Sequence, residues 1–90
     1  MTELLWEESA VQPGGRFHAH VGTLGKVGII QYDDSSWHVF NLPLGGHVSE
    51  RIPLKATTAA FAKVEATQLV VERLLEVRRR IDLALVECGQ

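Results

Sequence analysis

Hydrophobic and polar positions change their period along this chain, and the change divides it into two regions. In residues 16–21 apolar side chains alternate with His18 and His20, which is the two-residue period of a β-strand. Residues 26–32 are rich in β-branched side chains, and a polar break separates them from the aromatic segment 37–40. These three segments predict strands joined as an antiparallel meander.

The boundaries of the sheet are less regular in sequence. The short apolar segment 4–6 precedes the turn residues Gln12 to Gly15, so it is either a fourth short strand or an extended lead-in. Pro43 and the paired glycines that follow cannot continue a central strand, and residues 47–55 have no clear period. The sequence does not decide which face of the sheet is buried. Trp37 and Val39 lie on one face and Phe40 and Leu42 on the other, and either pair is apolar enough to form the core.

The last third of the chain predicts one long helix. Thr57 or Thr58 provides an N-cap hydroxyl, and neither glycine nor proline interrupts the chain again before Gly89. A continuous helix over residues 58–87 is ~45 Å long at a rise of 1.5 Å per residue. A six-residue strand spans only ~20 Å. The helix is therefore expected to be longer than the sheet that it covers.

The two halves of this helix carry different apolar residues. The first half has small side chains, which allow close packing on a sheet: Ala59, Ala60, Ala62 and Ala66. In the second half an apolar series alternates spacings of four and three, as in a helix that packs on another helix: Val70, Leu74, Val77, Ile81, Ala84 and Cys88. The helix either meets a second copy here or bends between 78 and 82 and folds back on the sheet.

These patterns predict a single α+β domain over residues 1–90. A three-stranded antiparallel sheet, or a four-stranded one if the lead-in pairs, occupies residues 1–55, and the helix over 58–87 packs on one face. We expect a homodimer, because exposed apolar helix surface is unstable in water. The residues expected at its interface are Val70, Leu74, Val77, Ile81 and Leu85.

Composition narrows the classes of function. Hydrophobic residues make up 46% and charged residues 22%, as in globular chains, and the formal charge of −2 disfavours binding through phosphate contacts alone. Cys88 is the only cysteine, which excludes an intramolecular disulfide and a cysteine-based zinc site. The acidic N-terminal segment and the absence of a long apolar run predict a cytoplasmic protein without a membrane span.

Three histidines are the candidates for metal binding. His18 and His20 share one strand face, and His38 follows on another strand, so a three-histidine site is conceivable. Only Asp33 and Asp34 offer carboxylates nearby in sequence. Histidines that are solvated or packed in the sheet are therefore the favoured interpretation, and we predict neither a metal ion nor a cofactor.

The same sheet face is a candidate binding surface, with His18, His20, Tyr32 and Phe40 as its residues. Aromatic and histidine side chains on an open sheet can stack on single-stranded bases. Such surfaces normally carry basic residues, and here only Arg16 and Lys26 are close in sequence. A contact with protein, or burial in the core, is therefore favoured over nucleic acid.

The run Arg78, Arg79 and Arg80 is the one basic cluster in the sequence. Successive helix residues point about 100° apart, so the three side chains do not form one patch. Glu76 and Asp82 stand four residues from Arg80 and Arg78 and can pair with them. A solvated, salt-bridged face is the favoured interpretation, and an acidic partner is the alternative.

No catalytic motif is recognisable. A nucleophilic serine motif, a helical zinc motif and a cysteine near a histidine are all missing from the sequence. One sheet and one helix also offer little concavity for a substrate. We therefore expect a protein that is not an enzyme.

One resemblance bears on function. The order Trp6-Glu7, the strand 16–22, Trp37-His38-Val39 after a polar hairpin, and a helix that opens at Thr57-Thr58 resembles the small β-β-β-α proteins encoded by bacteriophages and mobile elements. The resemblance covers residues 4–72 and does not extend to the long helix. It implies an accessory protein that acts on host machinery or on phage gene control, without assigning any residue a role.

Two functions follow as hypotheses. The first is a dimeric protein-binding module, a phage-type accessory or inhibitor that binds a host protein or complex. The alternative is a nucleic-acid-binding regulator of transcription or recombination that acts as a dimer and uses its sheets or its helix arginines.

Overall fold

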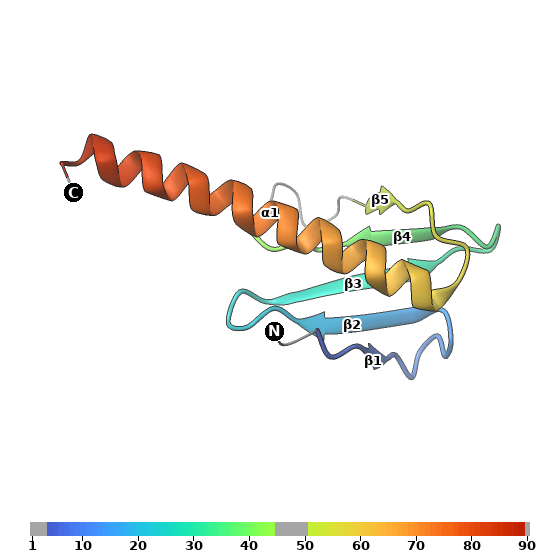
Figure 1. The fold of residues 1–90 in the computed structure, drawn as a ribbon. Coiled ribbons are helices and arrows are strands. Elements are labelled where there is room, and N and C mark those ends of the chain that lie inside the picture. Colours follow the sequence, from blue (N-terminus) through green and yellow to red (C-terminus); the bar gives the residue numbers. More distant parts are fainter. Residues whose placement is uncertain (1–3, 45–50, 90) are drawn as a thin grey trace.

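The computed structural model describes residues 4–44 and 51–89, which form an antiparallel sheet and one helix (Figure 1). The elements in chain order are β1 (Glu7–Glu8), β2 (Arg16–His20), β3 (Lys26–Gln31), β4 (Trp37–Phe40), β5 (Arg51–Pro53) and α1 (Ala59–Glu87). The α+β architecture with one C-terminal helix agrees with the sequence-based prediction.

The sheet has five strands in the order β1-β2-β3-β4-β5, and every neighbouring pair is antiparallel. The prediction of three or four strands was therefore too low. The segment 4–6 is not itself a strand, but β1 follows it directly and pairs with β2, with Glu7 opposite His18. β5 forms inside the stretch 47–55 that showed no clear period. Both additional strands are short edge strands. Pro53 is tolerated in β5 because an edge strand has one side free of ladder hydrogen bonds.

The buried side of the sheet is now defined. Phe17, Ile29, Trp37 and Val39 point to the side that is covered by α1, and all four are at most 8% exposed. Phe40 points to the opposite side, and Leu42 packs at the margin of the core from beyond the end of β4. Trp37 and Val39 therefore form the core in place of Phe40, which answers the question that the sequence left open.

The first half of α1 closes this core. Thr58 caps the helix, and its hydroxyl accepts a hydrogen bond from the backbone N–H of Phe61 at 3.3 Å. Ala62 and Ala66 are fully buried in the same cluster as the strand residues, and the helix lies against β3 and β4. Because alanine side chains are short, the helix axis can approach the sheet closely.

A carboxylate also fixes the entry into the helix. Glu65 accepts hydrogen bonds from the backbone N–H groups of Lys55 and Ala56, at distances from 2.9 to 3.0 Å. These contacts tie the connection after β5 to the second turn of α1. The direction in which α1 crosses the sheet is thus held at its start.

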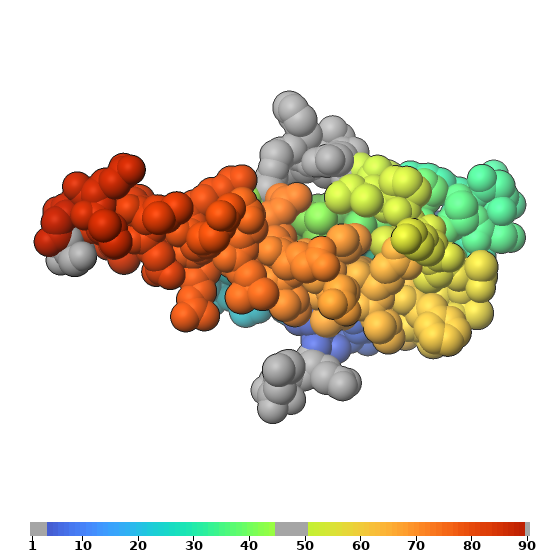
Figure 2. Space-filling model, turned by 45° about the horizontal axis from the view of Figure 1, so that its top comes forward, coloured from blue at the N-terminus to red at the C-terminus, as the bar shows by residue number. Residues whose placement is uncertain are grey.

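The second half of α1 leaves the sheet. The helix is continuous to Glu87, which makes it about 43 Å long at 1.5 Å per residue, and the long axis of the molecule measures 51 Å. The alternative of a bend between 78 and 82 is wrong. Figure 2 shows the orange-to-red end of the chain projecting away from the remainder. All residues from 78 to 89 are exposed.

Candidate interaction surfaces

The projecting part of α1, residues 75–88, is called the arm below. Its apolar residues include Ile81, 53% exposed, and Leu85, 47% exposed. Val70, which the sequence placed at the interface, is only 2% exposed and belongs to the core of its own chain, and Leu74 is half-buried at the margin of that core. The surface available to another molecule therefore begins at about Val77.

The apolar series of the arm continues the buried side of α1. Successive residues turn by about 100°, so spacings of four and three residues keep a series on one side of a helix. Ala62, Ala66 and Val70 cover the sheet, and the same series then runs through Leu74, Val77, Ile81, Ala84 and Cys88, which are called the seam below. The seam thus lies on the same side of α1 as the residues of its first half that pack on the sheet.

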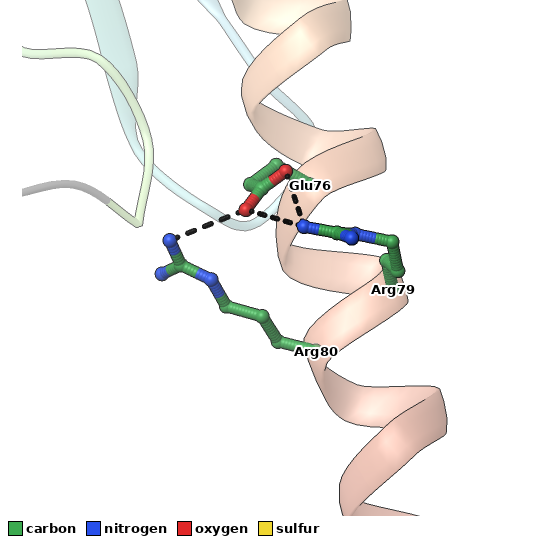
Figure 3. A network of polar contacts seen from close by, with 3 residues as sticks. All are labelled: Glu76, Arg79 and Arg80. Carbon is green, nitrogen blue, oxygen red and sulfur yellow. Dashed lines mark hydrogen bonds and ion pairs between the residues drawn. The ribbon is translucent and has the colours of Figure 1, made fainter.

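The basic run on the arm is partly neutralised. Glu76 lies 3.1 Å from Arg79 and 3.3 Å from Arg80, measured between carboxylate oxygen and guanidinium nitrogen (Figure 3). The hydrogen bond from Arg79 is the main cause that lowers the pKa of Glu76, and Arg80 adds a smaller electrostatic effect. The expected pair of Arg78 with Asp82 is not found among the ion pairs of the described residues. The arm therefore offers no concentrated basic patch.

The second surface is the side of the sheet that faces away from α1, called the open face below. Strand register brings its residues into adjacent rows: Arg16, Ile30, His38 and Pro53 in one, Glu7, His18, Gly28, Phe40 and Arg51 in the next, and His20 with Lys26 in the third. The structure thus brings His18, His20 and Phe40 to one side, as the sequence suggested. It adds Arg51, which the sequence analysis missed.

Phe40 occupies the centre of the open face. Its ring lies across Gly28, its neighbour on β3, so closely that a Cβ atom at Gly28 would lie only 2.2 Å from the ring. The guanidinium of Arg16 lies 5.3 Å from the ring centroid, and that of Arg51 lies 5.5 Å from it. Glycine at position 28 therefore makes room for a flat aromatic ring between two cations.

Tyr32 extends this cluster at the end of β3. Its hydroxyl accepts a hydrogen bond from Arg51 at 2.6 Å, and its ring centroid lies 4.4 Å from that of His38. Arg51 thus contacts both Tyr32 and Phe40. The sequence did not identify Arg51 as a residue of this face, because β5 is too short to show the two-residue period of a strand.

β3 separates His38 from His18 and His20, which lie together on β2. His18 pairs with Gly28 and His38 with Ile30, so the two imidazoles approach the open face from opposite sides of that strand. Nε2 of His18 lies 3.4 Å from a carboxylate oxygen of Glu7, which forms an ion pair when the ring is protonated. Within residues 4–44 and 51–89, no three histidine, cysteine or acidic side chains gather as a metal-binding group.

The acidic hairpin between β3 and β4 borders this surface. The side-chain hydroxyl and the backbone N–H of Ser36 both donate to Asp34, at 2.5 and 3.0 Å, and these bonds lower the pKa of Asp34. Because Asp34 is held by its own turn, its carboxylate stabilises the hairpin. It is not paired with the arginines of the open face.

A third surface is a groove between the lead-in and α1. It has a volume of about 520 Å³ and is lined by Leu4, Trp6, Ala60, Lys63, Val64, Thr67, Gln68 and Val71. The ammonium of Lys63 lies 4.1 Å from the ring centroid of Phe17, which holds the lysine at the side of the core. The lining contains no histidine or carboxylate, so the groove offers apolar contact and no acid–base pair.

Comparison with known proteins adds no relative, since no protein family, curated protein or solved structure matches this chain. Among the described residues, no helix is both long enough and apolar enough to cross a membrane.

Proposed function

We propose that this chain is a non-enzymatic protein-binding module that forms a homodimer through the seam of its arm. One observation carries the proposal: α1 continues past the sheet while its buried side keeps an apolar series that no part of residues 4–44 and 51–89 covers. Removing that surface from water would stabilise the protein.

A second copy fits the arm better than an oppositely charged partner does. Over residues 69–88 the helix carries four acidic and four basic side chains, so it has no net charge to attract a charged protein. Leu24, between β2 and β3, and Leu44, after β4, are both exposed. The connection between β2 and β3 lies at the end of the sheet from which the arm departs (Figure 1). The tip of a second arm would cover these leucines together with the seam.

The position of the sheet favours an antiparallel dimer. When the seams of two copies meet, the helix of the second copy lies on the same side of α1 as the sheet of the first copy. A parallel partner would bring its own sheet into the space of the first helix, because sheet and seam lie on the same side of α1. An antiparallel partner instead places its sheet beyond the tip of the first arm.

The antiparallel arrangement also pairs the side chains of the seam. Leu74 of one copy faces Ala84 of the other, and Val77 faces Ile81, in layers related by a two-fold axis. Arg73 of each copy then comes near Glu87 of the other copy.

Light scattering of the purified protein tests the dimer. We expect twice the chain mass of 10.0 kDa at micromolar concentration. Ile81→Glu should yield a folded monomer, because the charge would be buried at the seam. Leu83→Glu is the matched control, since Leu83 is 59% exposed on the other side of the arm. A monomeric wild type, or equal loss of mass in both variants, refutes the proposal.

Cross-linking tests the orientation. In the antiparallel dimer the two Cys88 residues are about 27 Å apart along the helices, too far for a disulfide, so oxidation of the wild type should give no covalent dimer. On a Cys88→Ser background, an equal mixture of Leu74→Cys and Ala84→Cys chains should cross-link. The opposite result, a rapid Cys88 disulfide and no mixed product, indicates a parallel dimer.

We further propose that the dimer acts as an accessory or inhibitor protein on a larger protein or complex in the cytoplasm of a host cell, as the resemblance to small phage-encoded proteins implies. The groove beside Trp6 supports this proposal, since it is apolar and stays free when the arms pair. Val64→Glu should abolish co-purification of a host protein at unchanged dimer mass, whereas Leu83→Glu should retain it. Retention by Val64→Glu would place the contact elsewhere.

A further inference from the structure

We infer that the open face of the sheet binds single-stranded nucleic acid, which goes beyond the dimerisation proposed for the arm. Three features of this face support the inference: its charge, its aromatic side chains and its width.

The open face is basic although the whole chain is not. Arg16, Lys26 and Arg51 point to this side, and the only acidic residue in its strand rows is Glu7 on the edge strand, where it already contacts His18. The chain as a whole carries a formal charge of −2. The strand rows of the open face therefore carry net positive charge, which complements a polyanion. The carboxylates of Asp33 and Asp34 lie in the bordering hairpin, where Ser36 holds Asp34.

Aromatic rings lie between these cations. One side of the Phe40 ring covers Gly28, so its other side is turned away from the sheet. The guanidiniums of Arg16 and Arg51 lie over this ring, 5.3 and 5.5 Å from its centroid. Tyr32 adds a second ring, which Arg51 holds through its hydroxyl. Two rings that could stack on bases thus lie between two guanidiniums that could contact phosphates. This combination is the one by which sheets bind unpaired bases.

The width of the open face favours a single strand over a duplex. Five strands at about 4.8 Å spacing give a sheet ~19 Å wide, and the major groove of DNA is only ~12 Å wide. The face cannot enter a groove, whereas a flexible single strand can lie across it. An acidic peptide would satisfy the arginines but has no planar bases to stack on Phe40 and Tyr32.

The arm does not compete for this surface. The open face points away from α1, and in the antiparallel dimer the two open faces lie on opposite sides of the assembly. Binding of nucleic acid is therefore independent of whether the dimer forms, and the failure of one proposal leaves the other standing.

Fluorescence anisotropy with a labelled single-stranded oligonucleotide of mixed sequence, as DNA and as RNA, tests the inference at low salt. We expect saturable binding that weakens with added salt at a logarithmic slope of about −1.4, for two phosphates contacted. Replacing both Arg16 and Arg51 with glutamine should weaken binding about tenfold or more. The control Arg78→Gln removes an exposed arginine of the arm and should bind as the wild type does.

The aromatic contribution needs its own variant. Phe40→Leu keeps an apolar side chain over Gly28 but removes the ring, and we expect about tenfold weaker binding with little change in the salt slope. Circular dichroism confirms that each variant is folded. Wild-type binding by the double arginine variant, equal weakening by Arg78→Gln, or displacement by poly-glutamate as effective as by unlabelled oligonucleotide would each overturn the inference.

Discussion

The two halves of α1 belong to one uninterrupted helix, yet they meet different surroundings. In the first half the sheet-facing positions are Ala62, Ala66 and Val70, all at most 2% exposed. In the arm the same side carries Ile81, which is 53% exposed. Two of the three sheet-facing residues are alanines, where a sheet lies close, whereas Ile81 is a large residue that the described residues leave exposed. The two halves thus differ in burial although they share one apolar side.

The largest expected effect is a difference in stability when a charge is placed at a buried position of the first half or at an exposed position of the arm. Val70→Asp places a charge in the core without a partner and should cost about 3 kcal/mol of unfolding free energy or more. Val86→Asp changes the same residue type where it is 69% exposed and away from the seam, so it should change stability very little. Thermal unfolding followed by circular dichroism measures both. Similar losses in the two variants would show that the halves do not differ as described.

A smaller effect is expected when an alanine is enlarged in each half of α1, because the space around the two alanines differs. Ala66→Leu adds bulk between helix and sheet and should destabilise the protein by about 1–3 kcal/mol. Ala84→Leu adds the same bulk to the seam, where we expect tighter dimers and no loss of stability. Chemical denaturation at several protein concentrations gives both values. If Ala84→Leu is as harmful as Ala66→Leu, the arm is packed in a way that differs from the proposed dimer.

Charge exchange tests the pairing of two arms more finely. Arg73→Glu and Glu87→Arg should each weaken the dimer two- to fivefold, the size of about 0.5–1 kcal/mol for an exposed ion pair. The double variant restores the opposite charges in the antiparallel dimer and should recover wild-type affinity. Sedimentation equilibrium provides the constants. Additive weakening in the double variant argues against contact between these residues.

The smallest effect concerns pH and the arm alone. Since its arginine neighbours lower the pKa of Glu76 from the ordinary value of 4.5, folding is favoured by the ionised carboxylate. This contribution is fully present above about pH 4.5 and is lost as the pH falls through the lower folded-state pKa. Helicity measured by circular dichroism should fall less steeply between pH 5 and 3 in Glu76→Gln. An identical acid profile would show that the pairs in Figure 3 contribute nothing.

Much of this arrangement could be predicted from local sequence. The cap at Thr58, the absence of breaking residues before Gly89 and the spacing from Leu74 to Cys88 all act within a few residues of each other. Helix formation depends on such short-range features, so its length was predicted to within one residue. Alternation placed His18 and His20 on one side of β2 for the same reason.

The edge strands could not be predicted in this way. β1 has two residues and β5 has three, and such short segments show no period. They are strands because β2 and β4 already present unpaired backbone groups, to which they add. Arg51 reaches Phe40 and Tyr32 only through this pairing, which is why the basic character of the open face escaped the sequence analysis.

The sequence by itself determined a helix that is longer than the sheet, and an apolar series that runs along the whole helix. Only the tertiary structure decided which part of that series is used: the sheet ends beneath Leu74, so Val70 is core and Ile81 is surface. The physical reason is that helix length follows from local hydrogen bonding, whereas burial depends on how far the neighbouring layer extends.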